Sequence, residues 1–227
     1  MKDLRPLTAE FVGTMMFVFL GAGSAVAFTG AGATTAPIGA LAVALAHGVG
    51  LAVVVSATMG ISGGHLNPAV TTGLWIADKI EGRAAVRYIL AQLAGALVGA
   101  ALVKGVLPRV PVAVALGGTP RLANDVTFIQ GVWIEATLTF VLVSAVFGTA
   151  VSPEAPKIGG WGIGLAVFVD ALVGGNLTGA AMNPARAFGP AVINLSFNAH
   201  AVYWIGPLLG AAVAAALWKA VLLPRKT

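Results

Sequence analysis

The sequence is short of charge and has no cysteine. Only 9% of its 227 residues are charged, whereas soluble domains carry about 25% charged residues. The absence of cysteine excludes disulfide bonds, a thiolate nucleophile and cysteine metal sites. The three histidines lie at unrelated depths, so they predict neither a metal cluster nor a nucleophile–base pair. We therefore expect no enzyme activity, no metal and no cofactor.

What the chain does contain is apolar. Hydrophobic residues make up 58% of it, too many for the water-facing surface of a soluble domain, and this predicts a membrane protein. A helical span needs ~20 apolar residues, so about six or seven spans fit and no separate soluble domain does. The net charge of +5 is then a property of the loops. We expect membrane lipid, and no nucleic acid, as the partner.

Six apolar stretches have the length of spans, and two more are about half as long. The short ones, residues 67–76 and 183–193, would each extend ~15 Å as helices, half of a ~30 Å hydrocarbon core. The sequence therefore predicts an all-α membrane protein with six transmembrane helices and two re-entrant half-helices, in a single domain over residues 1–227. The six expected spans are residues 7–28, 37–59, 84–106, 126–150, 158–174 and 200–223.

The distribution of Lys and Arg predicts the orientation. Six spans put both termini on one side, which collects nine cations, while the other side has Lys104, Arg109 and Arg121. We therefore expect both termini in the cytoplasm, and the cell membrane as the location. The first span is longer than a signal-peptide core and contains Glu10, so we expect it to be retained. The nine cations are Lys2, Arg5, Lys79, Arg83, Arg87, Lys157, Lys219, Arg225 and Lys226.

The two halves of the chain repeat each other. Residues 47–55 match residues 161–169 at six of nine positions, and three other features recur in the same order. Each half holds three spans, so the second half enters the membrane from the opposite side, with the site at the midplane between them. We place the repeats at about residues 5–106 and 126–223, joined by a loop at 107–125. The recurring features are Glu10 with Glu135, Asn67-Pro68-Ala69 with Asn183-Pro184-Ala185, and Gly95/Gly99 with Gly206/Gly210.

Each Asn-Pro-Ala triplet predicts the start of a half-helix. Asn is a strong N-cap, and Pro is favoured at the first helical position. Two half-helices entering from opposite faces would point their positive ends at one spot, which Asn67 and Asn183 can also supply with amide donors. A water molecule there would have its oxygen held and its hydrogens turned outward, so water passes while protons and cations are opposed. Carbonyl acceptors are expected from Gly63, Gly64, His65, Gly179 and Ala181.

These motifs resemble the two signature loops of the aquaporin, or major intrinsic protein, family. The segments are SGGHLNPAVT at 62–71 and GAAMNPARAFGP at 179–190, and AQLAGA at 91–96 is similar to that family's third span. The resemblance covers essentially the whole chain. It implies a passive water channel, assembled as a homotetramer, whose signature loops are supported by Glu10 and Glu135. It also implies a pore wall of Phe17, Leu51, Leu142 and Val167.

The resemblance also implies an outer selectivity filter formed by His47, Ala171, Ala180 and Arg186. Arg186 could instead only extend to the interface, and His47 could be a helix–helix hydrogen bond. His47 and the run GGNLTG at 174–179 are similar to the tonoplast-type subfamily. Ala171 departs from that pattern, where Ile is usual, so the constriction should be wider. Ammonia, hydrogen peroxide or other small neutral solutes then join water as expected substrates.

Other features bear on the substrate without deciding it. Glycerol facilitators carry Asp after Asn-Pro-Ala-Arg, where this chain has Ala187, and they lack the aromatic pair present here as Tyr203 and Trp204. That pair could equally be an interfacial belt. Asp170 either braces the outer loop or reaches the vestibule and attracts cations. His200 is expected at the interface.

Two rival functions stay open at this point. Inverted repeats and broken helices also occur in coupled secondary transporters, which need an ion or proton site. The buried acid without an assigned role, Asp170, is the residue on which such a site would depend. The second rival is a structural protein of the same fold with a closed pore.

Overall fold

The computed structural model describes residues 3–30 and 37–224, and all of the secondary structure in that part is helical. Lys2, Arg225 and Lys226 of the orientation count lie outside the described residues. Five described helices are long and apolar enough to cross a membrane. They are α1 (Arg5–Gly30), α2 (Pro37–Ser62), α4 (Gly82–Val106), α6 (Phe128–Val146) with its wider-turned extension η2 (Phe147–Val151), and α9 (Val202–Leu217) with η3 (Trp218–Leu222).

The fifth of the six expected spans, at residues 158–174, is shorter than the sequence predicts. Helix α7 covers Trp161–Gly174, and its 14 residues extend ~21 Å. The expected start at residue 158 was wrong because Gly159, at φ 60°, turns the chain. The Gly160 amide then donates to the Ser56 hydroxyl at 2.8 Å, which ties the start of α7 to α2.

The connection between the repeats is more ordered than a plain loop. Residues 107–125 contain a short helix, α5 (Arg109–Val114), and a single turn, η1 (Leu116–Gly118), neither of which the sequence analysis predicted. Gly118 has φ 76°, and a Cβ on it would lie 2.6 Å from the Ala22 carbonyl oxygen. Only glycine allows this close approach to α1.

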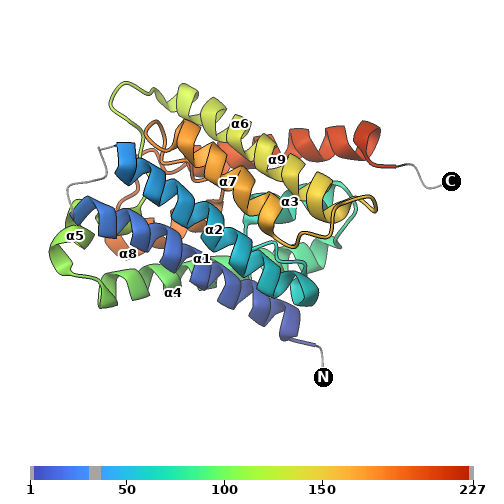
Figure 1. The fold of residues 1–227 in the computed structure, drawn as a ribbon, viewed down its shortest axis with the longest axis horizontal. Helices are drawn as coiled ribbons and strands as arrows, with labels where there is room; N and C mark the ends of the chain where they lie inside the picture. Colours follow the sequence, from blue (N-terminus) through green and yellow to red (C-terminus); the bar gives the residue numbers. More distant parts are fainter. Residues whose placement is uncertain (1–2, 31–36, 225–227) are drawn as a thin grey trace.

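The half-helices lie between the two repeats. Helix α3 spans Pro68–Ile76 and α8 spans Pro184–Asn194, close to the predicted ranges. Helix α3 packs against α9 of the other repeat, and α8 packs against α4. The longer helices pair within repeats, α1 with α4 and α6 with α9, while α2 crosses α7 between them. Figure 1 shows this arrangement, with the start of α1 and the end of η3 at the same end of the bundle.

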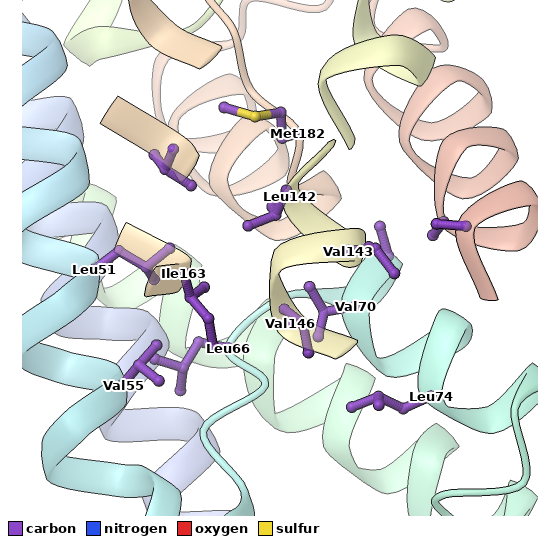
Figure 2. Packing of buried hydrophobic residues seen from close by; sticks show 14 of the residues in the cluster. Leu51, Val55, Leu66, Val70, Leu74, Leu142, Val143, Val146, Ile163 and Met182 are labelled. Atoms are coloured by element: carbon purple, nitrogen blue, oxygen red, sulfur yellow. The ribbon is translucent and has the colours of Figure 1, made fainter. Parts of the chain in front are cut away.

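The central apolar cluster surrounds the region where the halves meet. Leu51 and Val55 of α2, Val70 of α3, and Leu142 and Val146 of α6 point toward a common space (Figure 2). These side chains line the inner cavity described below. The core therefore forms the wall of a passage as well as packing the bundle.

Both glycine pairs that recur in the repeat lie at close helix crossings. A Cβ on Gly95 would overlap the Phe11 carbonyl of α1, and one on Gly210 would overlap the Ala136 carbonyl of α6. A Cβ on Gly99 would lie 2.5 Å from the Met15 oxygen, and one on Gly206 would lie 2.8 Å from the Val132 oxygen. Small residues let the backbones approach, which is the principal source of helix association in lipid.

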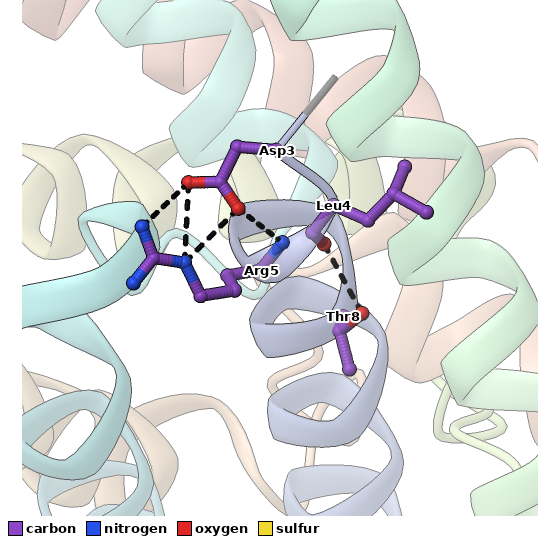
Figure 3. A network of polar contacts seen from close by, with 4 residues as sticks. All are labelled: Asp3, Leu4, Arg5 and Thr8. Carbon is purple, nitrogen blue, oxygen red and sulfur yellow. Dashed lines mark hydrogen bonds and ion pairs between the residues drawn. The ribbon is translucent and has the colours of Figure 1, made fainter. Parts of the chain in front are cut away.

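A polar contact precedes the first span (Figure 3). The exposed Asp3 carboxylate accepts a 3.0 Å hydrogen bond from the Arg5 amide and pairs with the Arg5 guanidinium at 2.9 Å. These contacts lower the pKa of Asp3 below its usual value. An ion pair that is so exposed adds little stability. We infer that it orders the start of α1.

Substituting Gly95 by Ala should lower the free energy of unfolding by ~1–3 kcal/mol, because overpacking a close contact costs about that much. Thermal unfolding in detergent micelles measures the change. Gly105→Ala is the matched control in the same helix, since a Cβ there meets nothing within 4 Å. Equal stability of the two variants would contradict the close crossing of α1 and α4.

Candidate functional site

Two asparagines begin the half-helices. The Asn67 side-chain oxygen accepts from the Ala69 amide at 2.8 Å, and its backbone is extended. The Asn183 oxygen accepts from the amides of Ala185 and Arg186 at 3.0 and 3.2 Å. Pro occupies the first position of both helices. Each asparagine is therefore an N-cap that satisfies amides which the first helical turn leaves unpaired.

The same two asparagines tie the repeats to each other. The Asn67 side-chain nitrogen donates to the Met182 carbonyl at 2.9 Å, and the Asn183 nitrogen donates to the Leu66 carbonyl at 2.9 Å. Each bond joins one half-helix to the residue just before the cap of the other. An amide nitrogen has two hydrogens, so each asparagine keeps one for the cavity that it lines.

Glu10 of α1 holds the first re-entrant loop. Its carboxylate is fully buried and accepts from the Ser62 hydroxyl at 2.6 Å, the His65 amide at 3.0 Å and the Leu66 amide at 2.7 Å. The Gln92 side chain of α4 donates to the same carboxylate at 2.7 Å. Four donors thus surround a group that would be costly to bury alone.

Glu135 of α6 does the same for the second loop. Its fully buried carboxylate accepts from the Thr178 hydroxyl at 2.6 Å, the Ala181 amide at 2.9 Å and the Met182 amide at 2.7 Å. The Tyr203 hydroxyl of α9 braces this loop from behind by donating to the Thr178 carbonyl at 2.8 Å. The two halves therefore use equivalent atoms for equivalent bonds.

The loops share an unusual backbone conformation. Leu66 and Met182 have φ of 51° and 50°, and Ala180 has φ 43°. Residues other than glycine pay a steric penalty in this left-handed region. The carboxylate bonds to the Leu66 and Met182 amides, and the asparagine bonds to their carbonyls, stabilise that conformation.

Arg186 and His47 meet at the outer side of this junction. Arg186 is 3% exposed; its Nη1 donates to the Gly118 carbonyl at 2.7 Å, and its Nη2 lies 3.1 Å from His47 Nε2. His47 Nδ1 lies 2.9 Å from the Val43 carbonyl, which can only accept. We assign the proton to Nδ1, which leaves Nε2 to accept from Arg186. His47 therefore offers no free donor to the cavities that it lines.

Two cavities of about 230 Å³ each meet at His47. His47 and Ala180 line both of them, while Arg186, Ala171 and Gly179 line the outer one. Pro68, Ala69, Pro184 and Ala185 are buried at the helix starts and line neither. The inner cavity is lined by Phe17, Leu51, Gly63, Gly64, His65, Asn67, Leu142, Val167, Ala181 and Asn183 among others.

Two further polar residues, Asp170 and His200, lie off this path, whereas His65 lines the inner cavity. Asp170 is buried, its Oδ2 lacks a hydrogen-bond partner, and it lines neither cavity, so it does not reach the vestibule. The His65 ring lies 3.2 Å from the Thr71 hydroxyl and packs on Tyr88. His200 is half-buried before α9 and accepts from the Trp204 indole at 3.1 Å. Burial lowers the pKa of His200.

Several residues of the hydrogen-bond network were missed by the sequence analysis. Ser62 and Thr178 each lie five residues before a cap asparagine and each precede a glycine, so the repeat carried this signal. Gln92 also donates to the Thr71 hydroxyl at 2.9 Å, and nothing in its apolar surroundings pointed to Glu10. Tyr203 was considered only as part of an aromatic pair, whereas its hydroxyl contacts a loop carbonyl.

Comparison with known proteins gives a consistent assignment. The family model for the major intrinsic protein matches residues 1–218. Aquaporin TIP1-2 of Musa acuminata is 42% identical over 99% of this chain and 89% of its own. Aquaporin TIP4-4 of Zea mays is 43% identical over 93% of this chain and 84% of its own.

A solved structure supports the same fold. The aquaglyceroporin from Plasmodium falciparum superposes with a TM-score of 0.87 over 96% of both chains, at 23% sequence identity. At that identity the likeness concerns the fold alone. Together with the matching family model and the plant relatives, it leads to one assignment: the chain belongs to the major intrinsic protein family.

Proposed function

We propose that this protein is a passive membrane channel for water. The observation that carries the proposal is the junction of two half-helices, capped by Asn67 and Asn183, beside a cavity that both asparagines line. The TIP-type relatives, named as aquaporins, support the same function. No chemical step is required of the protein, because water only has to cross the bilayer.

The junction favours water over ions. Each asparagine keeps one N–H for the path, and each half-helix adds the positive end of its dipole. A water oxygen held by both donors directs its hydrogens away from the centre, so a proton relay through that point is broken. A cation meets two positive helix ends, which raises its barrier. We propose that carbonyls of Gly63, Gly64, His65, Gly179 and Ala181 accept from water on either side.

The proposed filter is the ring of His47, Ala171, Ala180 and Arg186. Arg186 provides its donors: two of its N–H groups are held by Gly118 and His47, and its Nε is unpartnered. The second N–H of each Nη atom can hydrogen-bond a passing solute, while the charge of the guanidinium repels cations. His47 shapes the ring and orients the Arg186 side chain. It does not bond the solute through Nε2, because that atom already accepts from Arg186.

We propose that small neutral solutes also pass. Ala171 lines the outer cavity with a methyl group and leaves space in the ring. Ammonia and hydrogen peroxide are near water in size and make similar hydrogen bonds, so both should be measurable. Glycerol should pass poorly, because it needs an apolar wall for its carbon chain where His47 stands.

The proposal includes one channel per chain and a defined assembly. Two repeats, at about residues 5–106 and 126–223, form a single unit with Phe17, Leu51, Leu142 and Val167 as its wall. Glu10 and Glu135 support the loops. A homotetramer is proposed from family membership, and cytoplasmic termini from the excess of Lys and Arg on that side. We propose the cell membrane as its location.

The rival functions lack support in the site. A coupled transporter needs an ion site on the solute path, and the one candidate acid, Asp170, lines neither cavity. A purely structural protein would not need an outer cavity and an inner cavity that share His47 and Ala180 as lining residues.

Vesicles containing the protein should shrink faster than empty vesicles under osmotic shock, with a low activation energy, because water crosses without dissolving in lipid. Stopped-flow light scattering measures both quantities. Equal shrinkage rates with and without protein would rule out the water channel.

Asn183→Asp should increase sodium and proton leak, because it places a negative charge at the junction and removes the donor to the Leu66 carbonyl. The leak is read with dyes inside proteoliposomes. Asn176→Asp is the matched control, since Asn176 is exposed and lines only the outer cavity. A leak as low in Asn183→Asp as in this control would contradict the role of the junction in excluding cations.

Ala171→Ile should narrow the ring and reduce ammonia flux more than water flux, because ammonia benefits from the extra width. Internal-pH dyes and light scattering report the two fluxes on one preparation. Ala40→Ile, a substitution elsewhere in the outer cavity, should leave the ratio unchanged. If Ala171→Ile lowers both fluxes equally, Ala171 does not belong to the filter.

A further inference from the structure

Gly21 of α1 lies directly beneath the His47 ring. A Cβ built on Gly21 would lie 2.7 Å from both Cδ2 and Nε2 of the imidazole. Real Cβ atoms do not approach other atoms so closely, so the ring occupies space that any side chain at position 21 would need. Both residues are buried, and His47 is 6% exposed.

The His47 ring is fixed on its other sides as well. Its Nδ1 is bonded to the Val43 carbonyl of the same helix, and its Nε2 accepts from Arg186. Phe17 packs against it edge to face, with ring centroids 6.2 Å apart. The ring therefore cannot give way to a new methyl group without losing one of these contacts.

The internal repeat indicates what position 21 would otherwise be. Gly21 is eleven residues after Glu10, and Val146 is eleven residues after Glu135. Val146 lines the inner cavity with its side chain. Position 21 is thus the matching position in the outer half. Glycine supplies no side chain there, and the His47 ring lies against its backbone instead.

We propose that Gly21 is a positioning residue for selectivity: its missing side chain leaves the niche that holds the His47 ring back from the path. This inference rests on the proposed channel function and filter. Ring position sets the width of the constriction, because His47 lines both cavities. The ring position also sets where His47 Nε2 accepts from the Arg186 guanidinium.

A methyl group at position 21 would push the ring away from α1. The Val43 bond anchors the ring to α2, so the open direction is toward the space where the cavities meet. The constriction at His47 would then narrow, and the distance between His47 Nε2 and Arg186 Nη2 would change. Solutes larger than water should be affected more strongly than water.

The test compares wild type, Gly21→Ala, His47→Ala and the double variant as full-length protein in proteoliposomes. Water flux is read by light scattering, ammonia flux by an internal-pH dye, and urea uptake serves as a larger neutral probe. Gly23→Ala is the matched control on α1, since a Cβ there meets only ordinary contacts at 3.7 Å.

Gly21→Ala should lower the urea-to-water and ammonia-to-water ratios by about threefold or more, within the ~10-fold discrimination that one methylene can give in a packed site. In the His47→Ala background the same substitution should leave both ratios unchanged, because the two residues act as one unit. If Gly21→Ala alone fails to fold, recovery of folded, conducting protein in the double variant supports the contact.

Unchanged ratios in Gly21→Ala, or equal losses in both backgrounds, would overturn the inference while wild-type water flux upholds the channel. Misfolding of Gly21→Ala alone and of the double variant with His47→Ala to the same extent would also overturn the inference. Wild-type vesicles no faster than empty ones would overturn the proposed function and this inference together.

Discussion

The structure depends on a pair of reciprocal hydrogen bonds at the centre of the bundle. The Leu66 amide donates to Glu10 and the Leu66 carbonyl accepts from Asn183. In the same way the Met182 amide donates to Glu135 and the Met182 carbonyl accepts from Asn67. Each repeat thus completes the loop of the other. The two fully buried carboxylates are tolerated here because each is surrounded by hydrogen-bond donors.

The packing of the helices follows from that junction. Each half-helix packs on the last long helix of the opposite repeat, α3 on α9 and α8 on α4. The two repeats differ in the side chains that they place along the solute path. Arg186 follows the second asparagine, and its guanidinium contacts His47 and Gly118 from the first half and the connection. The position that matches Arg186 in the first half is Val70, so no guanidinium occupies the equivalent place there.

Much of the fold was accessible from the sequence because its signals are local. Apolar length indicated the spans, and the Asn-Pro caps indicated the half-helices. The start of α7 and the turn η1 were not accessible, since each depends on a long-range contact: Gly160 with Ser56, and Gly118 with Ala22. The contact of His47 Nε2 with Arg186 was not accessible for the same reason. The niche at Gly21 required the three-dimensional position of a ring from another helix.

The central claim is that water passes the junction while protons do not. The most direct measurement records osmotic shrinkage and internal pH at the same time in one preparation of proteoliposomes, with the wild-type protein, under an osmotic and a pH gradient. We expect water flux well above that of empty vesicles and a proton leak equal to theirs. A proton leak that rises in proportion to water flux would contradict the account, because a continuous proton relay would then cross between Asn67 and Asn183.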